Sequence, residues 1–212
     1  MPIDTWAVLY HINMNYFKQA GLVNADGTPV LPTSPEELLD QARQFKAATG
    51  KPYLIQALAN ENAMYTREFY TYMFQQNSDF FADPKNIRMD TPEARKFVNL
   101  FKQIFDEDLT TKDMDYAAAV SAFTAGDGGV SLNGTWLVGD YIAASKVEGS
   151  PLYNGYAVYP LPQLFARDAS YADGHSWVLP SKDRSAERPV SCSPSPLSFC
   201  ISVGARCKSR SA

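Results

Sequence analysis

The stretch DYAAAVSAFTAGDGGVSLNGTW, residues 115–136, decides the fold class of this chain. Asp115 is a typical helix N-cap, and the apolar residues after it predict a helix that continues past Phe123 to the next glycine. Residues 129–132, Gly-Val-Ser-Leu, predict a short buried strand. That strand leads directly into a turn at residues 133–136, Asn-Gly-Thr-Trp. The local unit is therefore a helix and then a strand, with a turn at the carboxyl end of the strand.

The same alternation recurs on both sides of this unit. Ser34 can cap a helix that has Pro35 in its first turn, Glu37 completes a capping box, and Gly50 supplies the end of that helix. Further helices are expected from Tyr65 to Met73, from Asp90-Thr91-Pro92-Glu93 to Phe105 and from Leu137 to Ala144, and further strands at 53–58, 156–159 and 176–179. Helices and short strands in this order predict an α/β sandwich around a mostly parallel mixed sheet.

Composition excludes several classes of function. The 212 residues are 45% hydrophobic and 20% charged, with a formal net charge of −4, so no basic surface for nucleic acid is expected. No apolar run approaches the roughly 20 residues that cross a bilayer. The cysteines, Cys192, Cys200 and Cys207, lie near the end of the chain, and His11 and His175 are far apart in sequence. This spacing predicts neither a metal site nor any other bound cofactor.

Trp136 is the first candidate for ligand contact, because ligand sites in open α/β sheets lie beyond the carboxyl ends of strands. An indole face matches the C–H face of a sugar, and the amide of Asn133 suits hydroxyl groups. The alternative is structural, with Trp136 in the core and Gly134 as a simple turn former. The residues alone favour that alternative.

Two other functions stay open from the residues. Glu61, Asp140 and Asp173 include possible carboxylate pairs for a glycoside-active enzyme, although most carboxylates are solvated surface groups. A protein-interaction lobe with its aromatic residues facing a partner is the other. The segment 174–178, Gly-His-Ser-Trp-Val, lacks the second glycine of a nucleophile elbow, so we do not expect a serine hydrolase.

Four segments together resemble a known family. Residues 3–5, 9–22 and 32–39, and above all Met114 to Trp136, are similar to segments of the extracellular solute-binding proteins of sugar ABC transporters, the maltose-binding-protein-like group. The resemblance extends from residue 3 to about residue 183 in the order of that family.

The resemblance implies a two-lobed, hinge-closing protein of the periplasmic-binding-protein type II fold. It implies no catalysis, a mono- or oligosaccharide in the cleft between the lobes, permease subunits as partners and a monomeric state. Residues 1–165 would form the second, C-terminal lobe, and 166–188 the crossover to a first lobe that is mostly missing. Residues 189–212 depart from the family, and we expect a disordered or frame-shifted tail there; the coding DNA would show whether another frame encodes a helix.

The resemblance also implies the site. Trp136 matches the sugar-stacking tryptophan of the family, residues 61–65 lie where other cleft contacts arise, and residues 174–177 resemble a segment that lines the cleft. Trp6 stands where many members have histidine, so we expect Trp6 to stack in its place. The expected ligand-binding residues are Asp4, Trp6, Glu61, Tyr65, Asn133, Trp136, His175 and Trp177.

The resemblance places an intact member in the periplasm, or outside the cell on a lipid anchor. The chain as written begins without the basic-then-apolar pattern of a signal peptide, so in this form we expect it in the cytoplasm.

Overall fold

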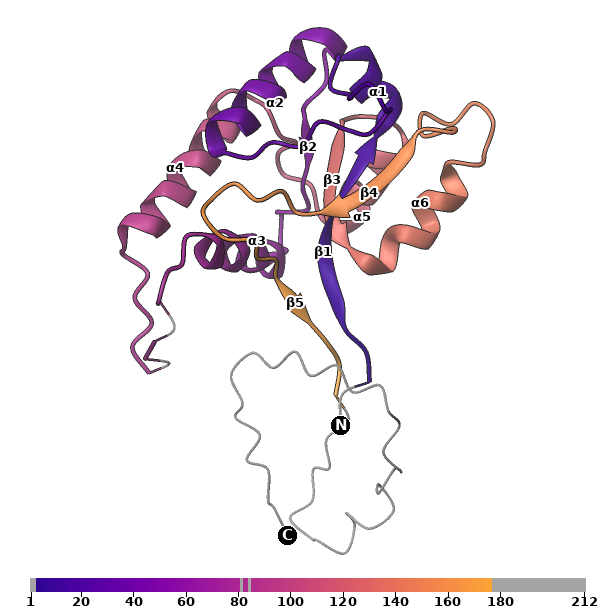
Figure 1. Ribbon diagram of the computed structural model, residues 1–212. Helices are drawn as coiled ribbons and strands as arrows, with labels where there is room; N and C mark the ends of the chain where they lie inside the picture. Colours follow the sequence, from indigo (N-terminus) through magenta and orange to yellow (C-terminus); the bar gives the residue numbers. More distant parts are fainter. Residues whose placement is uncertain (1–2, 81, 84, 177–212) are drawn as a thin grey trace, which may run out of the picture. The chain divides into compact units, whose positions relative to one another are not determined.

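The computed structural model describes residues 3–80, 82–83 and 85–176, and its sheet is built around one long strand. This strand, β1 (Trp6–Asn13), lies between β3 (Val130–Gly134) and β4 (Tyr156–Pro160), as Figure 1 shows. The short β2 (Leu54–Ile55) pairs with the outer side of β3. The equally short β5 (Ala172–Asp173) pairs with the start of β1.

The prediction of a mostly parallel sheet is wrong for the described strands. β1 runs antiparallel to β3, β4 and β5, and only β2 and β3 form a parallel pair of strands. The expected helix–strand units imply parallel neighbours, but β1 comes from outside those units and lies between them. Its sequence, WAVLYHIN, places polar His11 and Asn13 among apolar residues, and both are buried, so no alternation of polar and apolar residues marked it. The mixed α/β class is confirmed.

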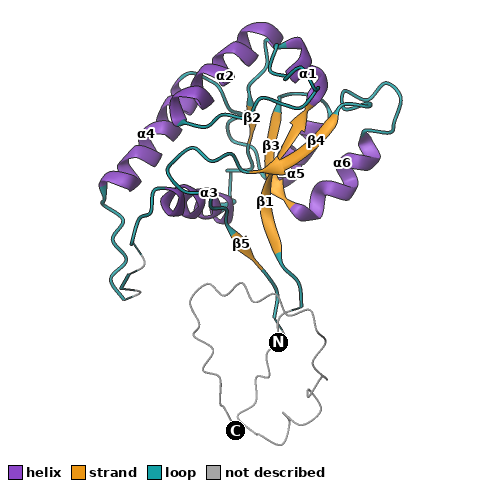
Figure 2. Ribbon diagram, in the orientation of Figure 1, coloured by secondary structure: helices purple, strands orange, loops and turns teal. Residues whose placement is uncertain are grey.

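The helices lie to either side of the sheet in Figure 2, with α2 and α4 to one side and α6 to the other. Their bounds are α1 Met14–Gln19, α2 Pro35–Thr49, α3 Asn62–Gln75, α4 Pro92–Asp106, α5 Tyr116–Thr124 and α6 Val138–Ala144, with a 3-10 turn at Thr135–Leu137. None of the described helices is long and apolar enough to cross a membrane.

Most expected helices are confirmed, and their caps explain where they begin. The Oγ atom of Ser34 accepts a hydrogen bond from Glu37 N at 3.1 Å, and Gly50 ends α2 with a φ of 69°. The Glu37 carboxylate accepts from Thr33 N and Oγ1, one residue before the position that a capping box requires. Asp115 caps α5 by accepting from Ala118 N at 2.8 Å.

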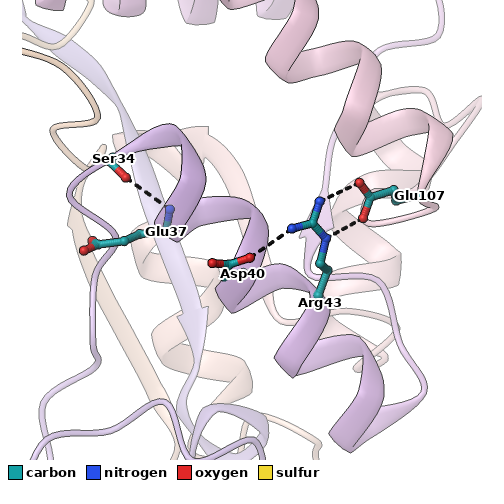
Figure 3. Close-up of polar contacts among 5 residues, drawn as sticks. All are labelled: Ser34, Glu37, Asp40, Arg43 and Glu107. Carbon is teal, nitrogen blue, oxygen red and sulfur yellow. Dashed lines mark hydrogen bonds and ion pairs between the residues drawn. The ribbon is translucent and has the colours of Figure 1, made fainter.

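An ion pair joins α2 to the residue that follows α4. The Nε and Nη2 atoms of Arg43 bind the two carboxylate oxygens of Glu107 at 2.6 and 2.7 Å, and Nη1 binds Asp40 at 2.9 Å (Figure 3). All three side chains are exposed, so this fork fixes the geometry of the helix pair more than it stabilises the fold.

Several expectations about strands need adjustment. The expected strand at 53–58 is reduced to β2, while 156–159 is confirmed as β4. β1 and α1 are new elements. Of the strand expected at 176–179, all but its first residue lies outside the described residues.

Within the described part of the chain, residues 3–175 form one compact unit with one main core. Aromatic side chains from three elements meet at its centre: Phe17, Phe45 and Tyr53 pack with centroids 5.5 to 5.9 Å apart, and the Tyr10 hydroxyl donates to Tyr53 Oη at 3.0 Å. Residues 166–175, the described part of the expected crossover, belong to the same unit. The division into lobes stays a prediction.

Candidate functional site

The carboxyl end of β3 supports Trp136 through a glycine. Gly134 has an ordinary φ of −84°, so it is not required for its backbone freedom. A Cβ atom on Gly134 would lie 2.1 Å from Cζ3 of the Trp136 ring. Only glycine lets the six-membered ring lie this close to the backbone. The structural alternative of a simple turn former therefore gives the wrong reason for Gly134.

A hydrogen bond from the five-membered ring fixes the indole of Trp136 at the end opposite Gly134. Its Nε1–H donates to the hydroxyl of Tyr116 at 2.7 Å, and Tyr116 is the first residue of α5. The indole N–H is therefore occupied by Tyr116. The Trp136 side chain is still 41% exposed. Trp136 is thus an exposed aromatic surface held in one orientation.

Two side chains contact this indole, and a third contacts its neighbour Trp6. Trp6, at the start of β1, meets Trp136 edge to face with centroids 5.3 Å apart, and Tyr171 lies 6.0 Å from Trp6. The guanidinium of Arg67, on α3, lies over both indoles, at 4.6 Å from Trp6 and 5.6 Å from Trp136. We call Trp6, Arg67, Trp136 and Tyr171 the tryptophan cluster.

Asp4 and His175 form a pair beside the start of β1. The backbone N–H of His175 donates to Asp4 Oδ1 at 2.8 Å, and His175 Nδ1 lies 2.9 Å from Oδ2. The backbone bond, and then the side-chain bond, lower the pKa of Asp4, so its carboxylate stays ionised. The pair extends the ladder in which Trp6 faces Asp173. Two predicted site residues are thus brought together here, both of them exposed.

Asn133 lies under the turn instead of on the surface. Its side chain is 1% exposed, and its Oδ1 accepts from Gly134 N at 2.8 Å. Its backbone carbonyl accepts from His11 Nε2 at 3.2 Å. Burial lowers the pKa of His11 to about 4, so the imidazole is neutral near pH 7. The structure therefore gives Asn133 a supporting position beneath Trp136.

The remaining predicted residues are less closely placed. Glu61 directly precedes α3, and Tyr65 lies one turn into that helix with 42% of its side chain exposed. Trp177 lies outside the described residues. Asp173, one of the carboxylates considered for an enzyme, accepts hydrogen bonds at both oxygens, from the Tyr171 hydroxyl and from Gly174 N.

Sequence reasoning missed three residues that shape the site. Arg67 occurs in a helix of mixed polar and apolar residues, where the sequence pattern does not distinguish it from an ordinary solvent-exposed arginine. Tyr116 carried a usable signal, because it follows the N-cap Asp115 in the segment that decided the fold. Tyr171 lies two residues before Asp173, but its contact with Trp6 depends on the pairing of β5 with β1, which the sequence did not reveal.

A buried carboxyl on α3, that of Glu68, was also missed. Glu68 Oε2 accepts from Gln56 Nε2 at 2.8 Å, and Thr110 donates to the other end of the same amide at 2.9 Å. Burial raises the pKa of Glu68 to about 8, so the carboxyl is mostly protonated at neutral pH. Glu68 adjoins Arg67, and its burial fixes which face of α3 turns toward the core.

The described residues have the fold of solute-binding proteins of the maltose-binding type. The cyclic alpha-maltosyl-1,6-maltose binding protein of Arthrobacter globiformis is 21% identical with a TM-score of 0.60, over 80% of this chain and 40% of that one. Maltose-bound T. maritima MalE3 is 19% identical with a TM-score of 0.65, over 82% and 43%. The GacH receptor of Streptomyces glaucescens is 18% identical with a TM-score of 0.59, over 81% and 41%.

The chain belongs to the bacterial extracellular solute-binding protein family, whose sequence profile matches residues 1–187. Among curated proteins, none matches this chain. The chain spans about two fifths of the length of the solved structures that it resembles.

Proposed function

We propose that this chain is the carbohydrate-binding part of an ABC-type sugar uptake protein, with the tryptophan cluster as one wall of its cleft. The ligand is a mono- or oligosaccharide, which is bound and not transformed. Family membership supports binding of a solute, and the similar structures named above are described as binding maltose, a cyclic maltosyl-maltose and acarbose.

The single observation that carries the proposal is the fixed, exposed indole of Trp136. Gly134 and Tyr116 hold the ring in place before any ligand arrives. A ring that is already ordered loses little side-chain entropy on binding, so more of the stacking energy appears as affinity. The hydrogen-bonded pair Asp4–His175 and the residues Glu61 and Tyr65 add polar contacts for hydroxyl groups in this proposal.

The proposal extends to partners and location. An intact member of this kind delivers its sugar to the permease subunits of the transporter, as a monomer in the periplasm or on a lipid anchor outside the cell. A second wall of the cleft would come from the rest of the family fold, because hinge-closing proteins bind their ligands between two lobes. Binding by one wall alone is weak, so the experiment needs a method that detects weakly bound sugars.

Saturation-transfer NMR tests the proposal on the 212-residue chain, because it detects weak ligands. A panel of neutral and acidic mono- and oligosaccharides should contain at least one that receives saturation from the protein. Trp136→Ala should remove that transfer. Tyr153→Ala is the matched control, because Tyr153 is equally exposed at 40% but precedes β4 near the opposite end of β1. Transfer that survives Trp136→Ala unchanged would show that the site is wrong.

A further inference from the structure

Arg67 is held inside the tryptophan cluster with most of its donors unused. Its guanidinium lies over two indole rings and is partly buried. The only hydrogen bond of this guanidinium to a described residue runs from Nη1 to the sulfur of Met64 at 3.2 Å, and a thioether sulfur is a weak acceptor. It forms no ion pair with any described carboxylate. A guanidinium carries five N–H donors in a rigid fork, so a set of directed donors faces the cluster unmatched.

The other polar groups around the cluster are already paired. The Trp136 N–H donates to Tyr116, and the Tyr171 hydroxyl donates to Asp173. Asp4 is bound by His175 through both of its oxygens. Within the described part of the chain, Arg67 is therefore the cation of the tryptophan cluster, and no described carboxylate pairs with it. A ligand that completes the site would supply acceptor oxygens to it.

We propose that the ligand is an acidic sugar, and that Arg67 binds the carboxylate of a uronic acid residue whose ring stacks on Trp136. This inference rests on the proposed function and deepens it by naming the substrate class. Carboxylate oxygens match the guanidinium fork in a bidentate geometry, and a charge-assisted pair is roughly twice as strong as a neutral hydrogen bond. Partial burial between two indoles reduces the screening of that pair by water.

The overall charge strengthens the assignment to Arg67 itself. The chain has a formal net charge of −4, so its general field repels an anion. A preference for an acidic sugar must then come from a local cation. Arg67 is that cation in the described cluster.

The experiment compares sugars that differ only in charge. Di-uronates of galacturonic, glucuronic and mannuronic acid, and the dimethyl ester of each, are titrated into the 212-residue chain and followed by saturation-transfer NMR. At least one acid should bind about tenfold more tightly than its ester, which corresponds to ~1.4 kcal/mol. That preference should shrink as sodium chloride rises from about 50 mM to about 500 mM, because salt screens the pair.

Three variants assign the effect to Arg67. Arg67→Gln should abolish the preference for the acid, so that acid and ester bind alike, while Arg67→Lys, which keeps the charge but loses the fork, should keep part of the preference. Arg95→Gln is the control, since it removes one positive charge of α4 from an exposed ion pair with Asp90, which precedes the helix, and should change nothing.

The outcomes separate this inference from the proposed function. Equal binding of every acid and its ester would overturn the inference while sugar binding stands. An acid preference that survives Arg67→Gln, or a sugar 6-phosphate bound more tightly than every uronate, would also overturn it. If no sugar in the panel binds and Trp136→Ala changes no signal, the proposed function fails and the inference fails with it.

Discussion

At the scale of single residues, Gly134 and Trp136 depend on each other. The indole covers the Gly134 backbone so closely that an added Cβ would lie 2.1 Å from a ring carbon. Gly134→Ala should therefore displace the indole, break its bond to Tyr116 and destabilise the fold by about 1–3 kcal/mol, as overpacking does. Urea denaturation and near-ultraviolet circular dichroism measure the two effects.

Gly139→Ala is the matched control for this change. Gly139 lies in α6, where an added Cβ meets no atom within 4 Å. Alanine in a helix is more stable than glycine by about 0.5–1 kcal/mol, so this variant should gain stability. If both variants behave alike, the close approach of ring and backbone at Gly134 has no energetic meaning.

At the same scale, the sequence predicted Trp136, Trp6, Asp4 and His175 as ligand-binding residues, and the structure pairs Trp6 with Trp136 and Asp4 with His175. The family resemblance identified these positions. The contacts between them depend on strand pairing, which the sequence did not predict. Arg67 could not be predicted as a site residue, because its neighbours in sequence do not distinguish an arginine that lies over two aromatic rings from one that faces water. Asn133 was placed in the site by its chemistry, and only the antiparallel pairing of β1 with β3 shows that it is buried.

At the scale of elements, the start of α2 shows how local chemistry sets a boundary. Ser34 Oγ satisfies the Glu37 N–H, which has no partner within the helix. Ser34→Ala should lower the free energy of unfolding by about 1 kcal/mol. Ser170→Ala, at an exposed loop position, should leave it unchanged in the same urea titration. A loss of the same size in both variants would argue against the cap.

The packing of α3 makes stability depend on pH through Glu68. Its pKa rises from 4.5 to about 8 on folding, so its contribution is present at low pH and is lost as pH rises toward 8. The pKa of His11 falls from 6.5 to about 4, so the stability linked to His11 is lost as pH falls through that range. The two slopes oppose each other below pH 6.5, and above it Glu68 acts alone of the two.

We therefore expect the free energy of unfolding to decline by up to about 2 kcal/mol between roughly pH 6.5 and 8, at 1.36 kcal/mol per unit of pKa difference. Glu68→Gln keeps the shape and the bond to Gln56 but cannot ionise, so it should remove this decline. Glu148→Gln, at an exposed loop position, should keep it. A decline that persists unchanged in Glu68→Gln would assign it to another group.

The elements also show what local patterns can predict. α2 and α5 were located well because each begins at a capping residue and ends near a glycine. β1 was not, because a strand buried with polar residues inside it has no alternation to detect. The prediction of parallel strands was wrong for the same reason, because β1 forms the antiparallel pairings.

At the scale of the whole molecule, the account rests on one wall of a cleft being ready before the ligand arrives. Strand β1, the residue before β5, helices α3 and α5 and the 3-10 turn after β3 each contribute a side chain to the cluster or its supports. The family resemblance pointed to Trp6 and Trp136, but not to Arg67, Tyr116 or Tyr171, and composition and periodicity predicted only the class of fold.

The most direct test of the central claim follows the indole N–H signals of Trp6, Trp136 and Trp177, the three tryptophans of the chain, while sugar is added. Nitrogen-15 correlation spectra resolve these signals, and Trp→Phe variants assign them. The account predicts that the Trp136 signal shifts progressively and saturates, with Trp6 affected next because the two rings are in contact. Saturable sugar binding that leaves the Trp136 and Trp6 signals unmoved would contradict the account.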